Sequence, residues 1–208
     1  MADAIETVAS CREAVGNDVD LCVEIHRRLT PAEAVVFADA IECYRPMFYE
    51  DPVTPDNLDE MVEVSRRVNI PIATGERLHS IWEFQALLQR GAVQFARVDV
   101  CMVGGISHAR KIAALAEAFH VQVVPHNPLS PVSTAICVQL AASIPNFAIQ
   151  ELPTSEEKSP KCDIVTQSIT VQDGYLLVPE GPGIGIELAP GAERILPRPR
   201  PFITRLHE

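Results

Sequence analysis

Short apolar segments recur along the chain at nearly constant intervals. They cover residues 20–25, 46–49, 70–74, 94–98, 121–125 and 146–150. Each segment is short and mostly apolar, which is typical of strands buried on both faces of a parallel sheet. The pattern therefore predicts six buried strands.

Helix signals lie between these segments. Thr30 is followed by proline and, three positions on, by Glu33, which together form a capping box. Ser80 and Glu83 repeat the box, and Gly91 ends the helix that follows. Further helices are predicted over residues 4–15, over 109–119 with a cap at Ser107, and over 134–142 after Ser133. Alternating strands and helices predict an α/β fold with right-handed crossovers.

The first polar or ionisable residue at the end of each predicted strand forms a regular series. Its members are Glu24, Glu50, Glu76, Asp99, His126 and Glu151. The interval of about 25 residues matches one βα unit of a TIM barrel, in which functional residues sit at the C-terminal ends of strands. We therefore predict a partial TIM-type β/α barrel. A doubly wound sheet is the alternative, but it would gather its site at one switch point.

The barrel prediction also divides the chain. Six βα units are two short of a closed barrel, so we expect the first two strands to be absent from this chain. Residues 1–153 are predicted to form the truncated barrel. Residues 154–208 are predicted to form a tail, with a β-hairpin turning at Gln172–Gly174 and a proline-rich surface coil over 190–201.

Composition narrows the class of protein. The net charge of −11 argues against a nucleic-acid partner, because phosphate contacts need clustered lysine and arginine. No apolar run reaches the length of a membrane-spanning helix, so no membrane partner is expected. The six cysteines contain no Cys-x-x-Cys pair, so we interpret them as reduced residues of a cytoplasmic protein.

The first three members of the series suit a metal ion. Carboxylates of Glu24, Glu50 and Glu76 that converged on one point would repel each other unless a cation lay between them. Ligation by oxygen alone fits Mg²⁺ best, and Mn²⁺ would also fit. The sequence thus predicts one hard divalent metal site.

The histidines of the series suit proton transfer. Asp99 ends the strand next to that of His126, and a carboxylate behind an imidazole fixes its tautomer and raises its basicity. His26 lies two residues past Glu24, so along an extended strand it would point to the same side. One histidine could remove a proton and the other could deliver one. This combination predicts β-elimination of water from a carboxylic acid that carries an α-proton and a β-hydroxyl.

Several motifs resemble the enolase superfamily, most closely its mandelate racemase-like sugar-acid dehydratases. These motifs are Val23-Glu-Ile-His26, Phe48-Tyr-Glu-Asp-Pro52, Ile72-Ala-Thr-Gly-Glu-Arg77, Arg97-Val-Asp99, Gly104-Gly-Ile106, Pro125-His-Asn-Pro128 and Gln150-Glu151. The similarity runs over residues 18–153 and resumes at 181–187. It implies that this chain also lacks the N-terminal capping domain of the family.

The resemblance implies a role for each matching residue. Glu24, Glu50 and Glu76 match the Mg²⁺ ligands, although the family usually has Asp where Glu24 stands. His126 with Asp99 matches the proton-abstracting dyad, His26 the general acid, and Glu151 a residue that holds the intermediate or the substrate. The implied substrate-binding residues are Arg28, Arg77 and Asn127.

The implied reaction is Mg²⁺-dependent dehydration of D-galactonate or a related aldonate to a 2-keto-3-deoxy acid through an enediolate, in a homo-oligomer. Two alternatives stay open. One is a racemase or epimerase of the same superfamily. The other is an inactive truncated barrel that serves as a binding or assembly subunit.

Overall fold

The computed structural model describes residues 1–195, which form two compact units. The first unit comprises residues 1–126 and 140–151, and the second comprises 127–139 and 152–195. The predicted boundary at 153/154 stays a prediction. Within the described range no helix is long and apolar enough to span a membrane.

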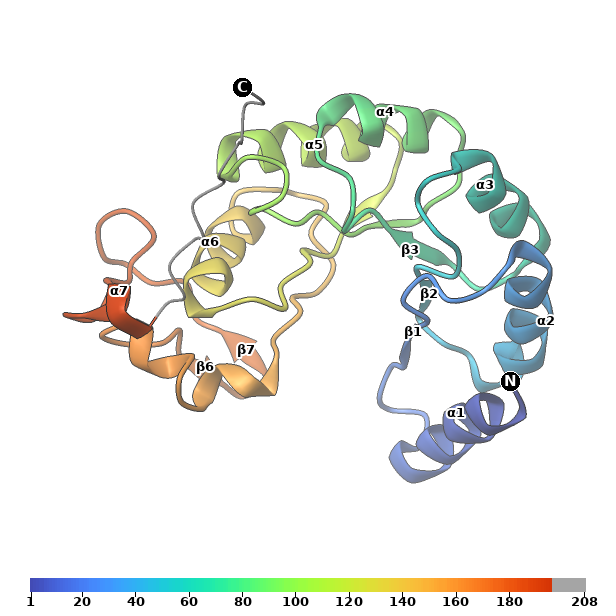
Figure 1. Cartoon of the computed structure of the whole chain (residues 1–208), viewed down its shortest axis with the longest axis horizontal. Coiled ribbons are helices and arrows are strands. Elements are labelled where there is room, and N and C mark those ends of the chain that lie inside the picture. Colours follow the sequence, from blue (N-terminus) through green and yellow to red (C-terminus); the bar gives the residue numbers. More distant parts are fainter. Residues whose placement is uncertain (196–208) are drawn as a thin grey trace, which may run out of the picture. The chain divides into compact units, whose positions relative to one another are not determined.

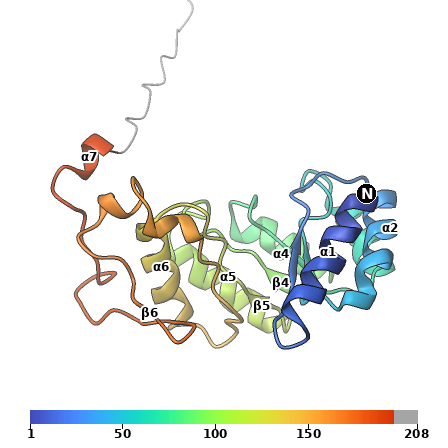
Figure 2. The same ribbon diagram turned by 90° about the horizontal axis from the view of Figure 1, so that it is seen from below.

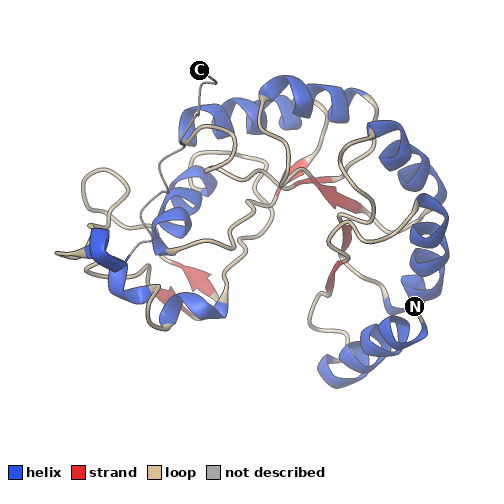
Figure 3. Cartoon of the chain, viewed as in Figure 1, coloured by secondary structure: helices blue, strands red, loops and turns tan. Residues whose placement is uncertain are grey.

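The first unit is an arc of a β/α barrel. Its five strands are β1 (Cys22–Glu24), β2 (Phe48–Glu50), β3 (Ile72–Thr74), β4 (Phe95–Ala96) and β5 (Gln122–Val123). All neighbours are parallel and follow chain order, which confirms the predicted parallel α/β architecture. Each strand is only two or three residues long, and long loops connect the strands to the helices (Figure 3).

Helices cover the outer side of this sheet (Figure 1). They are α2 (Pro31–Ile41), α3 (Leu58–Arg67), α4 (Ile81–Gln89) and α5 (Ile106–Ala118), and η1 (Glu42–Tyr44) extends α2. The first helix, α1 (Ala2–Val15), lies beside α2 (Figure 2). Each crossover helix thus returns the chain to the next parallel strand.

Local signals explain where the helices begin. The Thr30 capping box is formed in both directions, and the Ser80 hydroxyl accepts from the backbone of Glu83, as predicted. The predicted Ser107 cap is wrong, because α5 already begins at Ile106 after Gly105. No start signal in the sequence predicted helix α3. It begins after Asn57, whose side-chain oxygen accepts a hydrogen bond from the backbone N–H of Asp59.

Alternation along the strands separates two faces. In β2, Tyr49 faces the helices: its hydroxyl donates to Ala34 O at 3.3 Å, and its ring lies 6.0 Å from that of Phe37. Phe48 lies on the opposite face, with its ring 5.4 Å from Phe95. Because side chains alternate along a strand, Glu50 shares the inner face with Phe48.

The predicted sixth strand is reduced to a bridge. Val123 pairs in parallel with Phe147, and the backbone N–H of Val123 and Ala148 bond across it at 2.8 and 3.0 Å. The pairing does not continue far enough to form a regular strand, so the sheet has five strands rather than the six expected among the described residues.

Helix α6 (Pro131–Ala141) belongs to the second unit as far as Gln139. The other elements of this unit are η2 (Thr154–Glu157), η3 (Cys162–Ile164), β6 (Val171–Gln172), β7 (Tyr175–Leu176) and α7 (Ala192–Ile195). The hairpin of β6 and β7 is confirmed, but its turn is the pair Asp173–Gly174, both with positive φ, and not three residues. Helix α6 begins three residues earlier than predicted. The predicted coil over 190–201 is wrong at residues 192–195, which form α7, and the rest of that range after 195 lies outside the described residues.

Candidate metal and proton-transfer site

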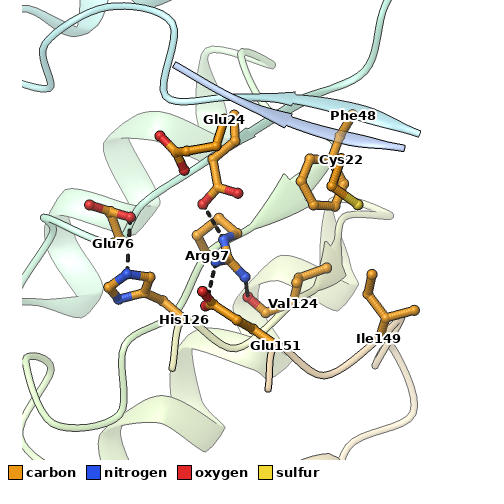
Figure 4. Close-up of a pocket in the computed structure, with 10 residues that line it drawn as sticks. Cys22, Glu24, Phe48, Glu76, Arg97, Val124, His126, Ile149 and Glu151 are labelled. Atoms are coloured by element: carbon orange, nitrogen blue, oxygen red, sulfur yellow. Dashed lines mark hydrogen bonds and ion pairs between the residues drawn. The ribbon is translucent and has the colours of Figure 1, made fainter. Parts of the chain in front are cut away.

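A cavity of about 290 Å³ lies at the C-terminal ends of the strands in the first unit (Figure 4). Its lining includes most of the predicted series, together with apolar side chains from one layer below. The lining residues are Cys22, Glu24, Phe48, Glu50, Glu76, Arg97, Val124, His126, Ile149 and Glu151. The regular spacing in sequence therefore becomes a single site in space.

Strand register brings the glutamates together. Glu24 and Glu50 are the last residues of β1 and β2 and pair directly with each other. Glu76 follows β3 by two residues, after Gly75 at φ +131°. A side chain at Gly75 would meet the Phe84 ring of α4 at 2.8 Å, so only glycine lets the backbone pass here. One carboxylate oxygen from each glutamate lies within 4.8 Å of those from the other two.

The charges of this cluster perturb its protonation. Although Glu24 as a whole residue is exposed, partial burial of its carboxyl group, followed by the charges of Glu50, Asp51 and Glu76, raises its pKa to about 8. Burial also raises the pKa of Glu50, and the adjacent Arg97 only partly offsets it. A site that forces a proton onto one of its own carboxylates has an excess of negative charge, which a bound cation would neutralise.

The donor set fits a hard divalent ion. All three groups are carboxylates that converge from neighbouring strands, and oxygen ligation of this kind suits Mg²⁺ or Mn²⁺ rather than zinc. Glu24, Glu50 and Glu76 would hold the ion. The close approach of the three oxygens together with the raised pKa of Glu24 supports this fit.

His126 lies between two carboxylates. Its Nδ1 is 2.9 Å from Asp99 Oδ2, and its Nε2 is 3.1 Å from Glu76 Oε2. Asp99 is itself fixed by the backbone N–H of Cys101 and Met102, at 2.8 and 3.0 Å. The predicted pairing of His126 and Asp99 is therefore present, and the ring also reaches the glutamate cluster.

The two acidic neighbours make His126 basic. Burial by itself lowers the pKa of the imidazole, but hydrogen bonds to Asp99 and Glu76 outweigh it and raise this pKa to about 9. In the same way, burial raises the pKa of Glu76, but His126 and Arg27 outweigh it and lower this pKa to about 2. Both carboxylates therefore increase the basicity of the ring.

Two arginines that the sequence analysis did not single out lie in the site. Arg97 is 3 % exposed; its Nε contacts Glu50, its second guanidinium nitrogen lies 2.6 Å from Glu151 Oε2, and it also donates to Val124 O. Arg27 contacts Asp51 and Glu76. Arg97 could have been found by its place, because it directly follows β4 and is thus a charged residue at the C-terminal end of a strand.

The other predicted residues are placed differently. His26 is exposed and adopts φ +57°, so the expectation of an extended strand there is wrong, and its side chain does not line the described cavity. Arg28 and Arg77 are exposed and form no ion pair with a described residue. Asn127 belongs to the second unit, where it is fully buried and donates to Thr134 Oγ1 at 2.6 Å. Their roles toward substrate stay predictions.

Known proteins are similar to this chain in sequence. Residues 1–192 match the family model described as enolase C-terminal domain-like. The D-gluconate dehydratase of Thermoproteus tenax is 37% identical over 197 residues, which are 95% of this chain and 39% of that protein. The D-galactonate dehydratase of Ralstonia nicotianae is 31% identical over 190 residues, which are 89% and 50%. The chain spans half or less of the length of these curated relatives.

Solved structures agree with the sequence relatives. A member of the enolase superfamily from Salmonella Typhimurium superposes with a TM-score of 0.89 at 34% identity, over 91% of this chain and 48% of that one. A mandelate racemase/muconate lactonizing enzyme from Sulfitobacter gives a TM-score of 0.85 at 37% identity, over 90% and 47%. The chain therefore belongs to the enolase superfamily, among its mandelate racemase-like members.

Proposed function

We propose that this chain carries the catalytic site of a Mg²⁺-dependent sugar-acid dehydratase that acts on D-galactonate, D-gluconate or a related aldonate. The observation that supports the proposal most directly is the convergence of the three glutamates beside the His126–Asp99 pair in one cavity. Relatives at 31 and 37% identity are named for dehydration of galactonate and gluconate.

The residues of the site have separate roles in the proposed elimination of water. Glu24, Glu50 and Glu76 would hold a divalent ion, and its positive charge would favour loss of the proton next to a substrate carboxylate. Asp99 holds the Nδ1 side of His126, so Nε2, the nitrogen that faces the glutamates, takes the α-proton. Arg97 holds Glu151 in place to contact a substrate oxygen.

The second half of the reaction loses water. The proposed general acid is His26, which gives its proton to the departing 3-hydroxyl, and the enol then becomes the 2-keto-3-deoxy product. His26 lies on an exposed turn directly after β1, so it acts only if this turn folds over the substrate. Substrate-binding roles for Arg28, Arg77 and Asn127, a cytoplasmic location and a homo-oligomeric state belong to the same proposal.

The test uses the chain as it stands and a version extended to the length of its relatives. Each is incubated with Mg²⁺ and a panel of aldonic and aldaric acids in deuterium oxide, and 2-keto acids and C2 deuteration are measured. A 2-keto-3-deoxy product supports the proposal. Deuteration at C2 with retention of the 3-hydroxyl would instead identify a racemase or epimerase. No product and no exchange, even from the extended protein, would overturn the dehydratase proposal and would leave a binding or assembly subunit as the remaining alternative.

A further inference from the structure

Arg27 occupies an unusual place beside the glutamates. It follows β1 by three residues and has φ +64°, a left-handed conformation that costs free energy for any residue except glycine. Its backbone N–H donates to Asp51 O at 2.7 Å, which fastens this turn to the chain after β2. The strained backbone thus directs a long cationic side chain toward the metal ligands.

The guanidinium group bridges two carboxylates. One of its nitrogens lies 2.8 Å from Asp51 Oδ2 and also contacts Glu76 Oε1. Asp51 is buried and is held from its other side by the Thr74 hydroxyl, which donates to Oδ1 at 2.6 Å. The Arg27 side chain is itself only 18% exposed. This contact is therefore a partly buried ion pair with a fixed partner and not an exposed surface pair.

Glu76 has both of its oxygens engaged. Oε1 accepts from Arg27 and Oε2 faces His126 Nε2 at 3.1 Å. A divalent ion bound by Glu76 must share or replace one of these partners. Replacing His126 would separate the proposed base from the cluster, whereas replacing Arg27 leaves the arginine its second partner, Asp51.

We infer that Arg27 is a positioning residue that competes with the divalent ion for Glu76 and thereby weakens metal binding to the three-glutamate site. When Glu76 ligates the ion, the guanidinium of Arg27 keeps only its contact with Asp51. This inference rests on the proposed metal site. The Mg²⁺ affinity of the site then depends on the guanidinium of Arg27 as well as on the three glutamates.

The test measures Mg²⁺ affinity by calorimetry, without substrate, for the native chain and Arg27→Gln. Removal of the competing charge should tighten Mg²⁺ binding by at least about fivefold, in the range of ordinary coupling between sites. Arg110→Gln removes the same charge from an exposed position of α5 outside the cavity and should change the affinity by less than about twofold, because solvent screens it. Arg27→Lys keeps the charge and should stay near the native affinity.

A merely structural role gives the opposite sign. If Arg27 only supports the turn, Arg27→Gln loosens the site and Mg²⁺ binds less tightly or unchanged, which would overturn the inference. Arg27→Gly, which suits the left-handed backbone, replaces the glutamine variant if that variant does not fold. Absence of Mg²⁺ binding in the native chain and in every variant would refute the metal site itself, and the role of Arg27 with it.

Discussion

The imidazole of His126 faces Asp99 through Nδ1 at 2.9 Å, and this contact fixes which ring nitrogen points into the cavity. Asp99 can orient the ring because two backbone N–H groups hold its other oxygen. The pair therefore behaves as a rigid unit at the ends of β4 and β5. Its geometry favours proton transfer at Nε2 and leads to the first prediction.

Asp99→Asn should lower the rate of C2 proton exchange by at least about 100-fold, the usual contribution of a general base. The amide would place its NH₂ or its oxygen against Nδ1 and would no longer stabilise the charged ring. The exchange rate is followed by NMR in deuterium oxide. His79→Gln, at an exposed loop position outside the cavity, serves as the control and should leave the rate unchanged.

Mg²⁺ should lower the pKa of His126 from its present value of about 9. A cation on Glu76 neutralises one of the two carboxylates that raise this pKa, and the imidazole then loses its proton nearer to neutral pH. NMR titration of the ring with and without Mg²⁺ measures the change. An identical titration curve in both conditions would argue against Glu76 as a ligand.

Glu50→Gln should remove most of the thermal stabilisation that Mg²⁺ gives. The substitution deletes one ligand charge and leaves the buried Arg97 without its partner in β2, so the protein without metal should also unfold at a lower temperature. Melting curves over a Mg²⁺ series test both effects. The control is Glu117→Gln, at an exposed position of α5; equal stabilisation of both variants by Mg²⁺ would rule out the glutamate site.

Mg²⁺ affinity should rise with pH up to about 8. The raised pKa of Glu24 means that this carboxyl group holds a proton at neutral pH, and metal binding must displace it. Below pH 8 the affinity should therefore increase by up to about tenfold per pH unit, and above pH 8 it should level off. Calorimetry in two buffers of different ionisation enthalpy detects the released proton. Glu24→Gln should abolish the release.

The second unit has a buried polar network that can be tested separately. Thr134 accepts from Asn127 Nδ2 and contacts Glu156, and all three residues are buried. Thr134→Val keeps the shape but leaves both partners short of a hydrogen bond, which should cost about 1–3 kcal/mol. Denaturant unfolding measures the loss. Thr170→Val, exposed in the same unit, should change the unfolding free energy by less than about 0.5 kcal/mol.

Much of the site follows from spacing alone. A parallel sheet in chain order puts every strand end on one rim, so a charged residue after each strand predicts a common cavity without knowledge of any contact. Glu24, Glu50, Glu76, Asp99, His126 and Glu151 were found in this way. The capping boxes of Thr30 and Ser80 were equally local, because each depends on residues three positions apart.

What the sequence did not reveal depends on contacts between distant segments. Arg27 reaches Glu76 across 49 positions and Arg97 reaches Glu151 across 54, and no periodic pattern encodes such pairs. The expected orientation of His26 failed because the chain leaves the strand in a left-handed turn directly after Glu24. The sixth strand shortened to a bridge since strand length depends on pairing with its neighbours, which a single apolar run does not specify.

Gly75 lies between the Phe84 ring of α4 and the end of β3, directly before Glu76. The same absent side chain leaves room for the Phe84 ring on the helix side and for the carbonyl of Arg97 on the sheet side. A methyl group at this position would clash with the ring and would crowd the carbonyl oxygen. Substitutions on the buried face of α4 around Phe84 would therefore shift Glu76, which follows Gly75, together with the backbone of Arg97. Substitutions in the outer layer of the barrel would thus alter the geometry of the proposed metal site without replacing any of its residues.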